Sequence, residues 1–176
     1  GRNGEGKSTF LKVLAGIVAA DDGDLKIQNS TRISYLEQQP PEDNDNTLFN
    51  IVAHGLGESG KIISKYHDAL KDGNISESSQ LQEQIESQDL WPYLHKIETI
   101  LNRFKLTADS SLSTLSGGWK RRVMLAKAIV QEPDILLLDE PTNHMDITAI
   151  IDLEKMLKDF HGTLILISHD RSFVKG

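Results

Sequence analysis

Apolar and polar positions follow two kinds of spacing along this chain, which together predict a mixture of strands and helices. Short apolar runs predict four strands, at residues 25–28, 32–36, 135–138 and 163–168. The run at 135–138 is continuously apolar, as in strands that are buried on both faces. Periodic apolar positions predict helices at residues 7–15, 118–130 and 147–160. The sequence therefore predicts an α/β fold.

A region dominated by helical patterns separates the early strands from the later ones. Thr47 is expected to cap a short helix, which glycines at positions 55, 57 and 60 then interrupt. The next helix is expected to have one apolar face, made of Ile62, Ile63, Tyr66 and Leu70. After a turn at residues 72–74, Ser76 opens a polar helix whose only apolar pair is Leu81 and Ile85. We interpret these two helices as a hairpin with a thin apolar seam.

A glycine-rich loop opens the chain. Residues 1–8, GRNGEGKS, fit the pattern G-x-x-x-x-G-K-[ST] of phosphate-binding loops. Glycines let backbone N–H groups point inward at phosphate oxygens, and the following helix presents its positive end to the same anion. Lys7 would contact the β- and γ-phosphates, and Ser8 would bind Mg²⁺. The candidate nucleotide-binding residues here are Gly1, Arg2, Asn3, Gly4, Glu5, Gly6, Lys7, Ser8 and Thr9.

The place of this loop predicts that the sequence is truncated at both ends. Residue 1 is already the first loop glycine, so the strand that feeds such a loop is expected upstream. The 19 Lys and Arg and 26 Asp and Glu give a charge of −7, which argues against nonspecific nucleic-acid binding by overall charge. The segment has no cysteine and hence no disulfide. No apolar run approaches the roughly 18 residues that a membrane span requires.

Two carboxylates follow the buried strand at 135–138. Asp139 suits Mg²⁺ binding, and Glu140 suits the role of a general base toward the attacking water, because ligands bind at the carboxyl ends of strands in open α/β sheets. The alternative is an acidic pair that serves only as a turn. His169 follows the last strand and would contact the γ-phosphate, and Gln38 would reach the metal or the water. Taken alone, His169 is more often structural and Gln38 an ordinary loop residue.

The run Leu115–Trp119, of sequence LSGGW, reads as a second anion-binding loop. The Ser116 hydroxyl and the backbone of Gly117 and Gly118 could donate to a phosphate. In a single module they have no phosphate to bind, because the first loop already surrounds the local nucleotide. This logic predicts that two such modules close face to face. Lys120, Arg121 and Arg122 follow, and we favour a solvated helix face over partner binding for them.

Together these motifs resemble the ABC ATPase superfamily across essentially the whole chain. The resemblance rests on the phosphate loop, Gln38, residues 115–119 and 135–140, Asp146 and His169, in the family order. The runs at 139–146 and 168–173 further resemble the ABC-F branch, and LSGGWKRR with Gln38 to Pro41 resembles the first nucleotide-binding domain of Uup-type proteins. Trp119 departs from the glutamine common at its position, and Met145 from the commoner leucine.

The resemblance implies a P-loop ABC nucleotide-binding domain with a mostly parallel sheet. Its expected parts are an ATPase core at 1–40, a helical subdomain at 41–114 with an inserted arm at about 58–89, and the signature helix and remaining core at 115–176. Gln38, Ser116, Gly117, Gly118 and Asp146 would then join the nucleotide site, and Gln38 also the metal site.

The same resemblance implies an ATPase that uses ATP and Mg²⁺ and pairs with a second ABC domain of the same chain. A cytoplasmic location and action on the ribosome or on nucleic acid are implied as well, through the arm or a C-terminal region outside this segment. One alternative is the ATP-binding subunit of a membrane transporter, against which the pair Asn143-His144 speaks. A non-catalytic ATP-binding switch is the other alternative, and it ranks last because the hydrolytic residues are present.

Overall fold

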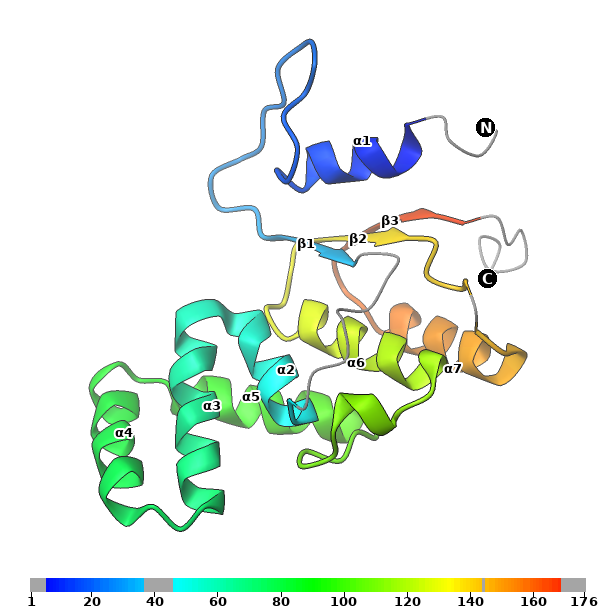
Figure 1. The fold of residues 1–176 in the computed structure, drawn as a ribbon. Coiled ribbons are helices and arrows are strands. Elements are labelled where there is room, and N and C mark those ends of the chain that lie inside the picture. Colours follow the sequence, from blue (N-terminus) through cyan, green and yellow to red (C-terminus); the bar gives the residue numbers. More distant parts are fainter. Residues whose placement is uncertain (1–5, 37–45, 144, 169–176) are drawn as a thin grey trace. The chain divides into compact units, whose positions relative to one another are not determined.

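The chain divides into two compact units in the computed structural model, which describes residues 6–36, 46–143 and 145–168 (Figure 1). Unit 1 comprises residues 1–40 and 132–176, and unit 2 comprises residues 41–131. In the sequence, unit 2 is therefore inserted into unit 1. None of the helices in the described ranges is both long and apolar enough to cross a membrane.

Unit 1 contains a parallel sheet of β1 (Ile33–Leu36), β2 (Ile135–Asp139) and β3 (Thr163–Ile167), in the order β1-β2-β3. The central strand β2 pairs with a neighbour on each side. Its three leucines, at positions 136 to 138, are fully buried, which explains their uninterrupted apolar run. The predicted strands at 32–36, 135–138 and 163–168 and the parallel sheet are confirmed.

Two helices of unit 1, α1 (Lys7–Leu14) and α7 (Ile147–Lys158), lie on opposite sides of this sheet in Figure 1. Parallel neighbours such as β2 and β3 need a crossover connection, and α7 provides it. Leu11 of α1 is buried, as are Leu153 and Leu157 of α7, so each helix turns an apolar stripe inward. Both helices were predicted, and their ends differ from the expected ones by one or two residues.

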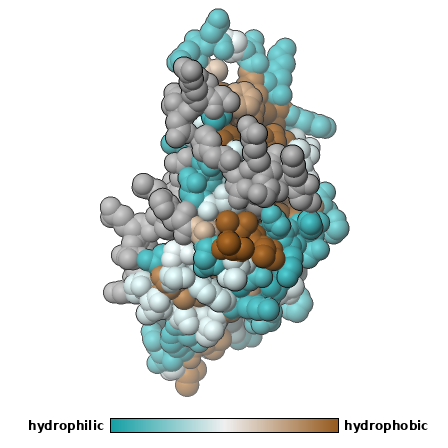
Figure 2. Space-filling model, turned by 90° about the vertical axis from the view of Figure 1, so that its right-hand side faces the viewer, coloured by the Kyte–Doolittle hydropathy of each residue, from teal (hydrophilic) through white to brown (hydrophobic). Residues whose placement is uncertain are grey.

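The predicted strand at 25–28 is wrong, because these residues form no regular structure. A strand requires hydrogen bonds from a neighbour, and the one sheet among the described residues does not include this segment. Leu25 and Ile27 are consequently 46% and 41% exposed. They belong to a larger group of exposed apolar side chains in unit 1, with Phe10, Ile17 and Val18. Hydrophobic colour reaches the surface in several separate areas of the face in Figure 2.

Unit 2 is helical over its described part. Its elements are α2 (Leu48–Ala53), η1 (His54–Leu56), α3 (Gly57–Lys71), α4 (Ile75–Ser87), α5 (Trp91–Arg103), η2 (Leu112–Thr114) and α6 (Gly117–Ile129). The short helix α2 packs against α3, α5 and α6, so it forms the middle of the unit. Thr47 caps α2 as expected, since its hydroxyl accepts the Asn50 N–H at 3.2 Å. Helix α6 confirms the helix predicted at 118–130.

Helices α3 and α4 form the predicted hairpin and lie side by side (Figure 1). Leu81 and Ile85 are buried, which confirms the apolar seam of α4. Asn74, not Ser76, opens α4: its side-chain oxygen accepts the Glu77 N–H at 3.2 Å. Leu70 was expected on the buried face of α3, but it is 54% exposed, because the last turn of α3 buries Ala69 instead.

Gly60 does not interrupt a helix, as the sequence suggested, but lies inside α3. It is there because the backbone of Ala53 approaches it closely: a Cβ at Gly60 would lie 1.7 Å from the Ala53 carbonyl oxygen. Only glycine allows this contact between α3 and the end of α2.

We predict that Gly60→Ala destabilises unit 2 by more than about 2 kcal/mol, because backbone atoms must move to make room for the methyl group. Ser59→Ala is the matched control, since Ser59 is the preceding residue of the same helix and is only half-buried. Amide hydrogen exchange of α2 and α3 in the full-length protein measures the effect. Equal protection in the two variants would contradict the assigned role of Gly60.

Candidate nucleotide site

The amino end of α1 carries the described part of the phosphate loop. Gly6 is the residue before the helix and has a φ of 71°, a left-handed conformation that glycine adopts without strain. No side chain caps this helix end, and Lys7 and Ser8 form its first turn, where both are half-buried. A helix end of this kind presents N–H groups and a positive dipole to an anion.

Asp139 ends β2 and is almost completely buried, with an exposure of 1%. Its Oδ2 accepts a hydrogen bond from the Tyr35 hydroxyl of β1 at 3.1 Å. Burying a carboxylate costs free energy unless hydrogen bonds replace its water, and Tyr35 supplies one of them. In the sequence, Tyr35 belongs only to the predicted strand at 32–36. The available signal for this contact was a tyrosine, with its polar hydroxyl, on a predicted strand of the same sheet as the acidic strand end.

Glu140 follows β2 in a left-handed conformation, with a φ of 45°, which is uncommon for a residue other than glycine. Its N–H donates to the Ile167 carbonyl of β3 at 2.9 Å, and its carbonyl accepts the Asn143 N–H at 3.3 Å. These two backbone bonds turn the chain sharply after β2. Glu140 is buried there, with an exposure of 6%. Backbone strain of this kind concentrates at functional sites.

The oxygen atoms at this end of the sheet suit Mg²⁺. Proteins usually bind this ion through one or two carboxylates together with substrate phosphates and water. Asp139 supplies a buried carboxylate, and the Ser8 hydroxyl lies on α1, which packs against β2. The described residues contain no cluster of three or more His, Cys, Asp or Glu that would hold a metal by itself. A buried carboxylate and a hydroxyl fit a Mg²⁺ ion whose other ligands are phosphate oxygens and water.

The second candidate loop begins α6 in unit 2. Ser116 is the N-cap residue, its side chain makes no capping bond, and Gly117 and Gly118 form the first turn. Trp119 is 39% exposed, and the Arg122 guanidinium lies 4.2 Å from the centre of its ring in a cation–π contact. The expectation that Lys120, Arg121 and Arg122 form a solvated face is wrong for Arg121, which is buried in unit 2.

Asp146 caps the amino end of α7. Its Oδ1 accepts the Thr148 hydroxyl at 2.6 Å and the Ala149 N–H at 2.9 Å. The Thr148 bond, followed by the Ala149 bond, lowers the pKa of this carboxyl below its ordinary value. The structure thus gives Asp146 a local structural role in addition to the one predicted from the sequence.

The remaining candidates lie outside the described residues. These are Gly1, Arg2, Asn3, Gly4, Glu5, Gln38 and His169.

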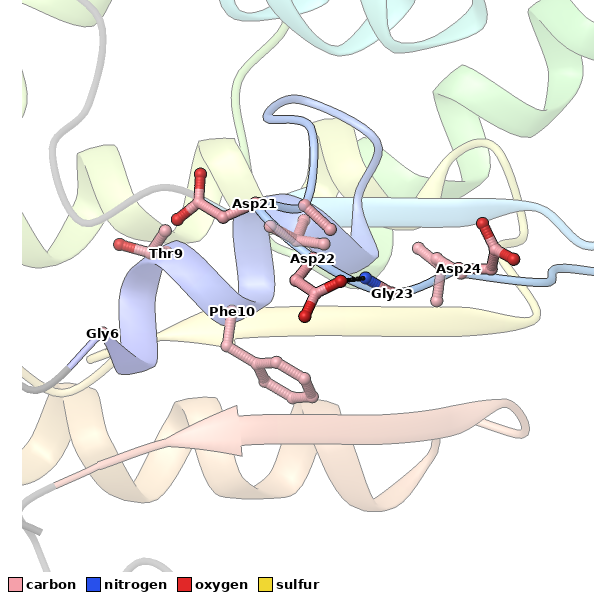
Figure 3. Close-up of a pocket in the computed structure, with 10 residues that line it drawn as sticks. Gly6, Thr9, Phe10, Asp21, Asp22, Gly23 and Asp24 are labelled. Atoms are coloured by element: carbon pink, nitrogen blue, oxygen red, sulfur yellow. Dashed lines mark hydrogen bonds between the residues drawn. The ribbon is translucent and has the colours of Figure 1, made fainter.

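A pocket of about 490 Å³ lies beside α1 in unit 1 (Figure 3). Gly6 and Thr9 line it among the candidate residues, together with the apolar side chain of Phe10. Asp21, Asp22 and Asp24, from the segment that follows α1, also line the pocket. Asp22 Oδ1 accepts the Gly23 N–H at 2.8 Å. Three carboxylates repel phosphate oxygens, so this pocket is unsuited to the phosphates of a nucleotide.

We predict that Asp146→Ala lowers the melting temperature of the full-length protein at pH 7, whereas Asp146→Asn largely preserves it, because asparagine caps helices as well as aspartate does. A carboxyl whose pKa is lower in the folded state stabilises the fold above its unfolded pKa of about 4, and this contribution fades as the pH falls further. The difference between wild type and Asp146→Ala should therefore shrink below pH 4. Equal losses in the two variants at pH 7 would contradict the capping role.

Comparisons with known proteins identify several relatives. The sequence profile of the ABC transporter family matches residues 1–143. ATP-binding protein Uup of Haemophilus influenzae is 43% identical over 99% of this chain and 28% of its own length. Energy-dependent translational throttle protein EttA of Mycobacterium tuberculosis is 32% identical over 99% of this chain and 33% of its own length. The solved structure of an inward-facing putative metal-chelate type ABC transporter matches this chain with a TM-score of 0.67 and 23% sequence identity. The match covers 99% of this chain and 62% of the transporter chain, and it shows a shared fold. The chain thus spans about a third or less of these two curated relatives.

Proposed function

Because the chain belongs to the ABC transporter family, we propose that it is one nucleotide-binding domain of a tandem ABC-F ATPase of the Uup type. The observation that carries this proposal is the end of β2. There a buried Asp139, held by Tyr35, is followed at once by a buried Glu140 in a strained conformation. A buried acidic pair of this kind is costly to maintain and suits phosphate chemistry better than it suits a surface turn.

We assign the steps of hydrolysis to the candidate residues as follows. Lys7 and the backbone after Gly6 bind the phosphates of ATP, and Ser8 and Asp139 hold Mg²⁺, with Gln38 as a further ligand. Mg²⁺, when bound, neutralises negative charge on the phosphate oxygens. Glu140 accepts the proton of the attacking water, and His169 orients that water toward the γ-phosphate. The products are ADP and phosphate.

The signature loop completes the site of a second domain. Ser116, Gly117 and Gly118 occupy the uncapped amino end of α6, which is suited to binding an anion from outside the unit. Asp146 would lie at the same closure. We infer that the second ABC domain of the same chain supplies the facing phosphate loop. ATP thereby becomes the ligand that closes the two domains on each other.

We favour the ribosome as the partner, and we propose that the protein recognises nucleic acid within it. EttA is by name a translational throttle protein. We assign to the α3–α4 hairpin the part of the inserted arm that the resemblance to ABC-F proteins implies. The charge of −7 argues against nonspecific adhesion to nucleic acid, so we assign the contact to a specific surface. A ribosomal partner also implies a cytoplasmic location, which we propose for the protein.

We predict that Glu140→Gln in the full-length protein lowers ATP turnover by about 10²–10⁴-fold, because the general base is lost while ATP binding remains. The variant should co-sediment with ribosomes in ATP and release them without ATP. Glu98→Gln, the same change at an exposed site of α5, is the matched control and should behave as wild type.

Two results would overturn parts of this proposal. Unchanged turnover in Glu140→Gln would remove the catalytic assignment. Absent ribosome binding with ATP binding intact would shift the function to DNA or, if the protein co-purifies with a membrane protein, to the ATP-binding subunit of a transporter.

A further inference from the structure

Tyr35 and Asp139 meet across two neighbouring strands of unit 1. The parallel register places Tyr35 of β1 beside Leu137 of β2. Side chains two residues apart on a strand point to the same face, so Asp139 lies one step further along the face that Tyr35 occupies. The tyrosine spans this diagonal, and its Oη donates to Asp139 Oδ2 at 3.1 Å.

The bond does more than hold the sheet together. Four register pairs already join β1 to β2 through their backbones, from Ile33 with Ile135 to Leu36 with Leu138. A hydroxyl at the tip of Tyr35 is therefore not needed to pair the strands. Its partner is a carboxylate with 1% exposure, whose orientation water cannot correct. The hydroxyl holds one oxygen of that carboxylate, Oδ2, by a hydrogen bond.

We propose that Tyr35 is a positioning residue that orients the Asp139 carboxylate for its metal ion. This inference rests on the proposed function, because it takes Asp139 as a ligand of the Mg²⁺ that accompanies ATP. Tyr35 acts through Asp139 and does not itself contact the nucleotide. Partners that hydrogen-bond to metal ligands orient them, and their loss typically weakens metal binding by about 10–100-fold.

Tyr35→Phe in the full-length protein removes the hydroxyl and keeps the ring. Mn²⁺, a spectroscopic substitute for Mg²⁺, is titrated in the presence of a non-hydrolysable ATP analogue and followed by electron paramagnetic resonance. We expect about a tenfold weaker Mn²⁺ affinity, unchanged analogue binding in the absence of metal, and a slightly lower melting temperature, because the buried carboxylate loses one hydrogen bond. Tyr93→Phe, the same change at an exposed position of α5, should leave all three quantities unchanged.

Asp139→Asn separates this inference from the proposed function. If Tyr35 acts through Asp139, then Tyr35→Phe has no further effect on Mn²⁺ affinity in the Asp139→Asn background. Unchanged Mn²⁺ affinity in Asp139→Asn alone would contradict the metal role of Asp139, and with it the proposed function. Weaker binding in Asp139→Asn but not in Tyr35→Phe would overturn the role of Tyr35 only. A lower melting temperature without a change in Mn²⁺ affinity would make Tyr35 purely structural and would also overturn it.

Discussion

The central position of β2 is the constraint on which the candidate site depends. This strand hydrogen-bonds to β1 on one side and β3 on the other, and its three leucines are fully buried. A strand held on both edges and both faces has little freedom to slide or twist. Its last residue, Asp139, therefore leaves the sheet at a fixed point, and the backbone bond from Glu140 to Ile167 extends that constraint by one residue.

Features that depend on local pattern were predictable from the sequence. The apolar run of β2, the spacing of α1, α6 and α7 and the Thr47 cap follow from residue type and spacing, and the structure confirms them. The motifs identified the ABC family, and the family profile over residues 1–143 bears this out. Motif residues are recognisable because the chemistry of phosphate binding restricts both residue type and spacing.

Features that depend on contacts between distant residues were not predictable. Leu25 and Ile27 have a strand-like composition, but a strand also needs a neighbour. Gly60 reads as a helix breaker until the close approach of Ala53 is known. Tyr35 and Asp139 are 104 positions apart, and no local pattern links them. Asp146 caps α7. This role was not predicted, because Asp146 belongs to a motif that was interpreted only in terms of nucleotide binding.

The insertion of unit 2 between β1 and β2 also orders events in time. A ribosome that synthesises this chain releases Tyr35 early and Asp139 only after all of residues 41–131. Contacts within the helical unit are closer in sequence than the pairing of β1 with β2, so they form sooner at a smaller loss of chain entropy. The helical hairpin and the signature helix are therefore complete before Asp139 and Glu140, to which we assign hydrolysis, have a sheet to hold them, and the candidate nucleotide site is the last part of this domain to form.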